Sequence, residues 1–191
     1  MGGSKKLGRP KGSCGKKGTL SNHEIDLIVK SIMNANRSNK YRNATLILFN
    51  HYLGLKAVDL AALKISDVFN GKDMLGGLVV SKVEPVRVLV FKQELQITLG
   101  SYIKNRMEKE GETFDLNLRL FKSQKGEFLP GTLARLINTI YKGSGFPNAT
   151  SHTGKRSFVK SLITQTQDIN VIGKMTGDVS MNVRRYLDEG K

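Results

Sequence analysis

The sequence predicts an α+β fold that is mainly α, with one small antiparallel sheet. Three observations lead to this prediction. Apolar residues recur at helical spacing in several segments after residue 21. Only residues 78–91 are dense in β-branched residues, and a Glu-Pro pair divides them. The 191 residues, 39% apolar and 25% charged, are typical of one folded domain rather than of a disordered chain.

The predicted helices begin just after residue 21. Ser21 and Glu24 have the spacing of a capping box, and the apolar residues that follow predict a helix over residues 22–35. A second helix is expected from residue 44 to Gly54, which suits a C-cap. Further helices are expected over residues 57–63, 93–110 and 133–141, with two or three short ones from His152 onward.

The one predicted sheet is a β-hairpin. Residues 78–83 and 87–91 are rich in valine and leucine, and they flank Glu84-Pro85, which interrupts the pattern at the expected turn. The chain thus alternates helices with one hairpin, and no internal repeat is found.

Positive charge is the strongest compositional signal. The chain has 31 Lys and Arg against 16 Asp and Glu, a formal charge of +15, which favours a polyanionic partner. The alternative, an amphipathic helix on a membrane surface, is weakened because no one helix concentrates the cations. The lone Cys14 excludes an internal disulfide and a cysteine-rich metal site. We expect a cytoplasmic bacterial protein associated with the nucleoid, with no membrane partner.

The first 18 residues are predicted to be a flexible basic arm that precedes a folded domain over residues 19–191. The arm has six glycines and no acid, so it lacks the apolar surface that folding needs. Gly8-Arg9-Pro10-Lys11-Gly12 resembles the core of an AT-hook, which lies in the minor groove of A·T-rich DNA. A generic solvated basic tail is the alternative. The cations expected to contact DNA here are Lys5, Lys6, Arg9, Lys11, Lys16 and Lys17.

Three stretches of the domain carry a further pattern. The first, residues 51–68, contains Gly54-Leu55-Lys56 before an acid, Asp59, and an Ala-Leu helix. The second comprises residues 120–126 and 149–158, with Ser-His-Thr-Gly-Lys-Arg-Ser-Phe at its end, and the third pairs Gly177-Asp178 with Arg185-Tyr186. In order and spacing, together with the intervening hairpin, these stretches resemble the catalytic domain of tyrosine recombinases, the phage-integrase family.

The resemblance implies a specific chemistry. In that family a tyrosine hydroxyl attacks a DNA phosphodiester and forms a 3′-phosphotyrosyl link, without metal or cofactor, while arginines clamp the phosphate and stabilise its transition state. Tyr186 occupies the nucleophile position, His152 the position of the proton-transferring histidine, and Lys82 that of the hairpin lysine. Lys82 is alternatively a solvated turn lysine, and Asp59 is alternatively a local cap.

Three inherited positions depart from the family pattern. Lys56 and Lys155 stand where the two catalytic arginines belong, and Asp178 replaces a histidine. Arg156 is adjacent to the second arginine position, but one helical residue turns a side chain by about 100°, so we expect it to point elsewhere. The interval from Asp178 to Tyr186 is also one residue shorter than the interval that usually separates the Gly-His pair from the tyrosine in that family. Lysine keeps the charge but loses the bidentate fork of arginine.

The sequence therefore favours a double-stranded DNA-binding protein of tyrosine-recombinase type with impaired catalysis, acting as a regulator or accessory factor of a mobile element. An active minimal recombinase or integrase is the alternative, and a basic protein–protein module is a third interpretation. A homodimer or higher oligomer on DNA is compatible with either of the first two interpretations. Besides the arm, the residues expected to contact DNA are Lys56, Lys155, Arg156 and Arg185.

Overall fold

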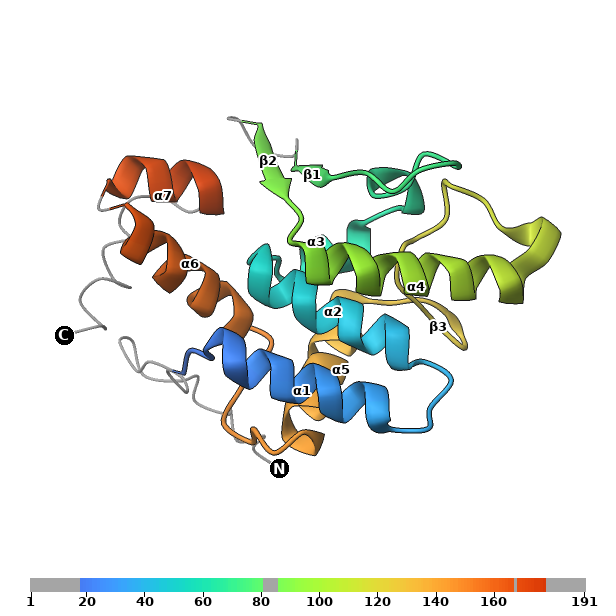
Figure 1. Ribbon diagram of the computed structural model, residues 1–191, viewed down its shortest axis with the longest axis horizontal. Coiled ribbons are helices and arrows are strands. Elements are labelled where there is room, and N and C mark those ends of the chain that lie inside the picture. The colour runs from blue at the N-terminus through green and yellow to red at the C-terminus, as the bar shows by residue number, and fades with distance from the viewer. Residues whose placement is uncertain (1–17, 81–85, 167, 178–191) are drawn as a thin grey trace, which may run out of the picture.

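The structure is a computed structural model that describes residues 18–80, 86–166 and 168–177. Its elements, in chain order, are α1 (Asn22–Asn34), α2 (Lys40–Tyr52), α3 (Ala57–Ala62), the 3-10 turn η1 (Ile65–Asp67), β1 (Gly77–Val80), β2 (Arg87–Val90), α4 (Gln93–Glu110), η2 (Gly111–Thr113), β3 (Lys122–Ser123), β4 (Gly126–Glu127), α5 (Pro130–Gly143), α6 (Thr153–Gln165) and α7 (Ile169–Thr176). Helices dominate, and the strands pair as two small antiparallel sheets (Figure 1). The predicted mainly helical α+β fold is confirmed.

Helix α1 begins where the capping box predicts. The Glu24 N–H donates to Ser21 Oγ, and the Ser21 N–H donates to the Glu24 carboxylate. These bonds satisfy backbone donors that the start of a helix otherwise leaves without partners. The isoleucines that follow at helical spacing form the buried face of the helix. Capping and hydrophobic periodicity therefore specify the same first element.

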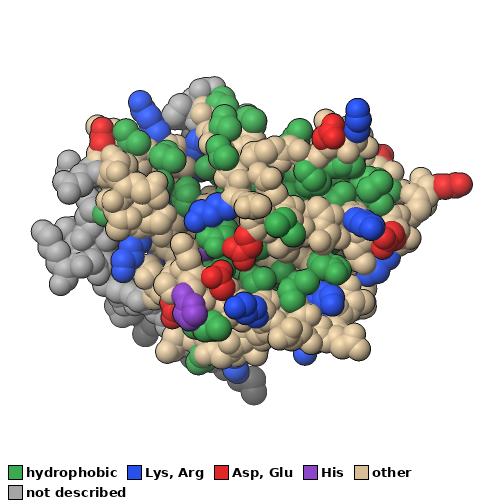
Figure 2. All heavy atoms as spheres, viewed as in Figure 1, with side chains coloured by type: hydrophobic (Ala, Val, Ile, Leu, Met, Phe, Trp, Pro, Cys, Tyr) green, Lys and Arg blue, Asp and Glu red, His purple; other side chains and the backbone are tan. Residues whose placement is uncertain are grey.

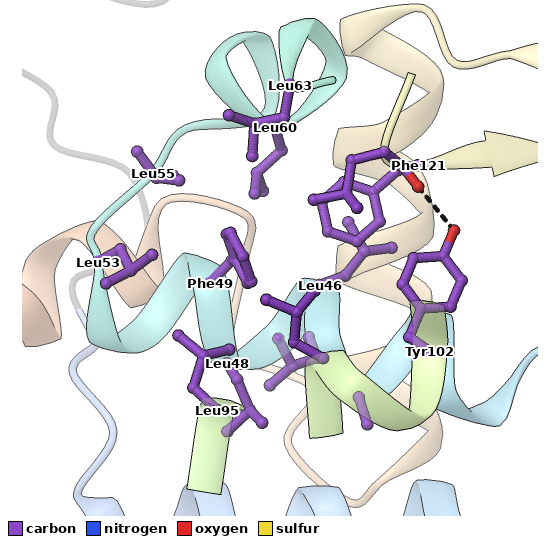
Figure 3. Close-up of a cluster of buried hydrophobic side chains, with 14 of the residues drawn as sticks. Leu46, Leu48, Phe49, Leu53, Leu55, Leu60, Leu63, Leu95, Tyr102 and Phe121 are labelled. Carbon is purple, nitrogen blue, oxygen red and sulfur yellow. Dashed lines mark hydrogen bonds between the residues drawn. The ribbon is translucent and has the colours of Figure 1, made fainter. Parts of the chain in front are cut away.

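Helix α2 is the central element of the core. All residues from 43 to 51 are buried, and α1, α3, α4, α5 and α6 all contact the helix. The Phe49 ring meets the Phe121 ring edge-on, with centroids 5.8 Å apart, in the cluster that Figure 3 shows. The Tyr102 hydroxyl donates to the Leu120 carbonyl at 2.8 Å, the dashed line of Figure 3, so this polar group is satisfied inside the cluster. Helices α3 and α6, which contact α2, are consequently packed against a buried element.

The predicted hairpin is present as β1 and β2. Gly77 pairs with Val90 and Val80 with Arg87, so Leu78 and Leu89 lie opposite one another and are buried. The valines that alternate with them are exposed, as the period of two along a strand requires. Strand β1 is described as far as Val80, so its predicted continuation to residue 83, with Lys82, lies outside the described residues.

A second hairpin, β3 with β4, is absent from the sequence prediction. Lys122 pairs with Glu127 and Ser123 with Gly126. The strands have two residues each and lack β-branched side chains, so no propensity signal marks them. Gly126 has a φ of +110°, which glycine adopts without strain and which allows the tight reversal.

Charge is distributed over the folded part. On the face shown in Figure 2, Lys and Arg side chains are spread out, with Asp and Glu between them, and no single basic patch dominates this face. In the part of the chain that the structure describes, no helix combines the length and apolar character that crossing a bilayer requires.

Candidate nucleic-acid interface

The buried side chain of Asn50, near the end of α2, joins the first and second sequence motifs. Its Nδ2 donates to the Leu55 carbonyl at 2.8 Å and to the Ser151 carbonyl at 3.0 Å, and its Oδ1 accepts from the Tyr141 hydroxyl at 3.1 Å. Each of the two carbonyls directly precedes a predicted site residue in the chain. One side chain therefore fixes the start of α3, the start of α6 and a side chain of α5 relative to one another.

The first turn of α6 lies in close contact with α2. A Cβ added to Gly154 would collide with both the side chain and the backbone of Asn50, so only glycine allows this approach. The preceding loop is held by the Ser151 N–H, which donates to Asn138 Oδ1 at 2.6 Å. The Thr150 N–H donates to Thr153 Oγ1 at 2.9 Å. The segment that carries the second motif is thus held against α2 and α5, and a local bond fixes its turn.

Lys56 is the N-cap residue of α3, and its side chain is exposed. Its N–H donates to Asp59 Oδ2 at 3.0 Å. Asp59 therefore caps the helix that Lys56 begins, in agreement with the local interpretation of this acid. A carboxylate in the first helical turn also interacts favourably with the helix dipole.

His152 is the N-cap residue of α6 and is exposed. Partial burial lowers the pKa of its imidazole, and the positive charges of Arg156 and then Lys56 lower it further. The N-terminus of α6 adds a positive end of a helix dipole. The charges of Arg156 and Lys56 thus both act on the His152 imidazole, and we refer to Lys56, His152 and Arg156 as the electropositive cluster.

Lys155 is not part of that cluster. Lys155 is only 3% exposed, and its Nζ donates to the carbonyl of Thr176, near the end of α7, at 2.5 Å. The ammonium group therefore points into the contact between α6 and α7, the two helices at the left of Figure 1. A cation at the C-terminal end of a helix is stabilised by the carbonyl groups there.

The remaining sequence-predicted site residues lie outside the described residues. These are Lys82, Asp178, Arg185, Tyr186 and the arm cations Lys5, Lys6, Arg9, Lys11, Lys16 and Lys17. Their roles therefore stay predictions.

Sequence reasoning missed Asn50 as an organiser of the site. The available signal was its position, because it is an amide that directly follows the apolar run over residues 46–49. Burying a polar side chain destabilises the fold unless the side chain is hydrogen-bonded, so a buried amide indicates hydrogen-bond partners.

His51, the neighbour of Asn50, makes folding stability depend on pH. The ring is 5% exposed, Nε2 lies 3.1 Å from Asn22 Oδ1, and Nδ1 is buried without a hydrogen-bond partner in the described structure. Burial lowers its pKa to about 4, Lys92 adds to this lowering, and Glu24 opposes it. The neutral ring is therefore the folded form.

Between the ordinary histidine pKa near 6.5 and about 4, the unfolded chain binds a proton at this position and the folded chain does not. Above about pH 6.5 the neutral His51 ring costs the protein no stability. As the pH falls to 4, we expect the free energy of unfolding to decrease by on the order of 2 kcal/mol because of this residue. Urea unfolding at several pH values measures this, and His51→Gln should flatten the profile. His23→Gln, which changes an exposed ring at the start of α1, is the matched control. A profile that His51→Gln leaves unchanged would contradict the assignment.

Among the described residues, no group of three or more His, Cys, Asp or Glu side chains is placed to hold a metal ion. The site consists of cations, a histidine and a helix N-terminus, a set that suits a phosphate oxygen.

No family model matches the chain. The chain is similar to the tyrosine recombinase XerA of Pyrococcus furiosus, with 24% identity over 157 residues, which are 81% of this chain and 52% of that protein. The chain thus spans about half the length of this curated relative.

Several solved structures are similar in fold, among them two Xer recombinases. The crystal structure of XerA recombinase has a TM-score of 0.71 and 23% identity, over 89% of this chain and 60% of that one. The XerH site-specific recombinase bound to its difH substrate has a TM-score of 0.69 and 21% identity, over 91% of this chain and 52% of that one. Both confirm the predicted fold.

Proposed function

We propose, from the premise that this chain has the fold of the tyrosine recombinase catalytic domain, that it binds double-stranded DNA and cleaves it poorly or not at all. The observation that carries the proposal is the cluster of Lys56, His152 and Arg156 at the start of α6. Two cations and a helix N-terminus attract a phosphodiester in its ground state. Similarity to the XerA and XerH recombinases supports DNA as the polyanion.

Impaired catalysis is proposed because the positions that resemble those of the catalytic arginines are lysines. Lysine attracts a phosphate as a point charge but lacks the planar fork that matches two phosphate oxygens at once. The loss of one preorganised donor costs about 3 kcal/mol of transition-state stabilisation, or roughly 100- to 1000-fold in rate. Lys56 is exposed, whereas the Lys155 ammonium is bonded to a carbonyl inside the fold, which supports a second loss at that position.

A chain that binds recombination sites without cutting them would regulate or assist recombination, and we propose such an accessory role in a mobile element. Binding as a homodimer or a higher oligomer is part of this proposal, and sedimentation of the protein with and without duplex DNA measures it.

A phosphotyrosine-trapping suicide duplex tests the proposal directly. We expect a mobility shift with duplex DNA at low salt and no covalent protein–DNA adduct. An adduct that Tyr186→Phe abolishes would instead establish the second candidate, an active minimal recombinase, which the family resemblance of Tyr186, His152 and Lys82 favours. Absence of any shift at low salt would leave a protein–protein module as the better interpretation.

The basic arm gives a separate prediction about affinity. Deletion of residues 1–18, which removes six cations, should lower duplex affinity and reduce the slope of log K against log salt, by about 0.9 for each phosphate that the arm neutralises. Preference for A·T-rich duplex should weaken as well, and Arg9→Ala should reproduce much of that effect if the segment binds as an AT-hook. An unchanged slope would refute a role of the arm in DNA binding.

A further inference from the structure

We propose that Arg156 has replaced Lys155 as the second phosphate-binding cation of the site, and that Lys155 and Arg87 instead position the end of α7. The inference rests on the proposed DNA-binding function and specifies which side chains carry it out. The sequence pattern alone assigns the second cation to Lys155.

The environment of Lys155 is that of a structural residue. Its side chain is buried, and its Nζ is hydrogen-bonded to the Thr176 carbonyl. To reach a DNA phosphate, the ammonium would have to leave this bond and move through the contact between α6 and α7. The negative end of the α7 dipole also favours a cation where it is. Position 155 therefore carries a positive charge, but that charge is bound to a backbone carbonyl of the protein.

Arg87 brings a second cation to the same end of α7. Gly177 follows Thr176 with a φ of +65°, and a Cβ added there would lie 2.9 Å from the guanidinium carbon of Arg87. Arg87 Nε is buried without a hydrogen-bond partner among the described groups. Strand β2 and helix α6 thus each supply a cation to the last turn of α7, the point from which the chain continues toward Tyr186.

Arg156 follows Lys155 on α6, and one helical residue turns its side chain by about 100° from that of Lys155. The Arg156 N–H donates to the His152 carbonyl, so the two residues are one helical turn apart, and side chains at this spacing share a face. Arg156 is half-buried, and its charge acts on His152 more strongly than that of Lys56. The Asn50 bonds hold the backbone before Lys56 and His152 together. A phosphate at the start of α6 would accordingly meet a guanidinium fork, an ammonium and a helix N-terminus.

The salt dependence of duplex binding separates the two cations. For Arg156→Gln we expect the slope of log K against log salt to fall by about 0.9, the value for one neutralised phosphate. Arg156→Lys should keep the slope, because it keeps the charge. Lys155→Met, which retains the apolar stem, should leave the slope unchanged. Arg37→Gln, an exposed arginine between α1 and α2, is the control and should also leave it unchanged.

Hydrogen exchange tests the positioning role without DNA. In Lys155→Met, amide protection over residues 172–177 should fall by about tenfold, the factor for removal of one charge-assisted hydrogen bond, while α1 and α2 keep theirs. Lys155→Arg, which keeps a donor for the Thr176 carbonyl, should restore part of the protection. If Lys155→Met does not fold, Arg87→Met provides the same local measurement.

The outcomes distinguish this inference from the function on which it rests. Wild-type protein that shows no shift with duplex DNA would remove the proposed function. Wild-type binding with a slope lowered by Lys155→Met and unchanged in Arg156→Gln would overturn the exchange of roles and leave DNA binding intact. Protection of α7 that is unchanged in both Lys155→Met and Arg87→Met would overturn the positioning role.

Discussion

Replacement of Asn50 by alanine is expected to lower the free energy of unfolding by about 4 kcal/mol. The side chain is 0% exposed, gives two hydrogen bonds to backbone carbonyls and accepts one from the Tyr141 hydroxyl. Its removal leaves these buried groups without their partner, at about 1–3 kcal/mol for each group that water does not reach, and leaves a cavity. Urea unfolding monitored by circular dichroism measures the loss of stability.

Two variants show whether the effect comes from these bonds. Tyr141→Phe removes one of the three bonds and should cost about 1 kcal/mol. Asn34→Ala, at the exposed end of α1, should change stability by no more than about 0.5 kcal/mol. Duplex affinity of folded Asn50→Ala protein should also fall, because Lys56 and His152 lose their common anchor. Wild-type stability in Asn50→Ala would refute the organising role of this side chain.

Gly154→Ala is expected to destabilise the protein by about 3 kcal/mol, the upper range for overpacking a tight contact. The added Cβ would overlap the backbone of Asn50, which the core holds and which cannot move aside as the end of a flexible side chain would. The start of α6 must then shift away from α2, carrying His152 and Arg156 with it. Thermal unfolding measures the stability, and the duplex mobility shift measures the effect on the site.

Gly100→Ala is the matched control for this prediction. Gly100 lies inside α4, and a Cβ there meets no atom within 4 Å. Alanine exceeds glycine in helix propensity by about 1 kcal/mol, so this variant should be more stable than wild type. Opposite signs for the two substitutions are the expected result. Equal stabilisation by both would show that α6 does not approach α2 as closely as the structure places it.

Local signals in the sequence determine much of the fold. The Ser21–Glu24 capping box marks the start of α1, the apolar periodicity over residues 93–110 marks α4, and the β-branched residues mark the hairpin. Each depends on residues close together in the chain, so a pattern in sequence is enough. Strands β3 and β4 were not predicted because two-residue strands of polar residues are defined by their pairing and not by their composition.

The candidate site divides in the same way. The sequence identified Lys56, His152, Lys155 and Arg156, and it predicted a basic domain with the tyrosine recombinase fold. It did not determine which cations share a face. That assignment depends on the contact of α6 with α2 at Gly154, on the Asn50 hydrogen bonds, and on the carbonyl of Thr176 that receives Lys155. Apart from the Asn50 bond to Leu55, these partners are 21 to 104 residues apart in the chain, so only tertiary packing brings them together.

The sequence by itself determined the number of charges, the motifs and the type of fold, because charge and helical periodicity are properties of the residues and their spacing. Only the tertiary structure decided the direction of each charge. Lys155 and Arg156 are adjacent and equally cationic, yet one is bonded to the end of α7 and the other lies with His152 and Lys56. The physical reason is the burial of one face of α6, which fixes the direction of every side chain on the helix.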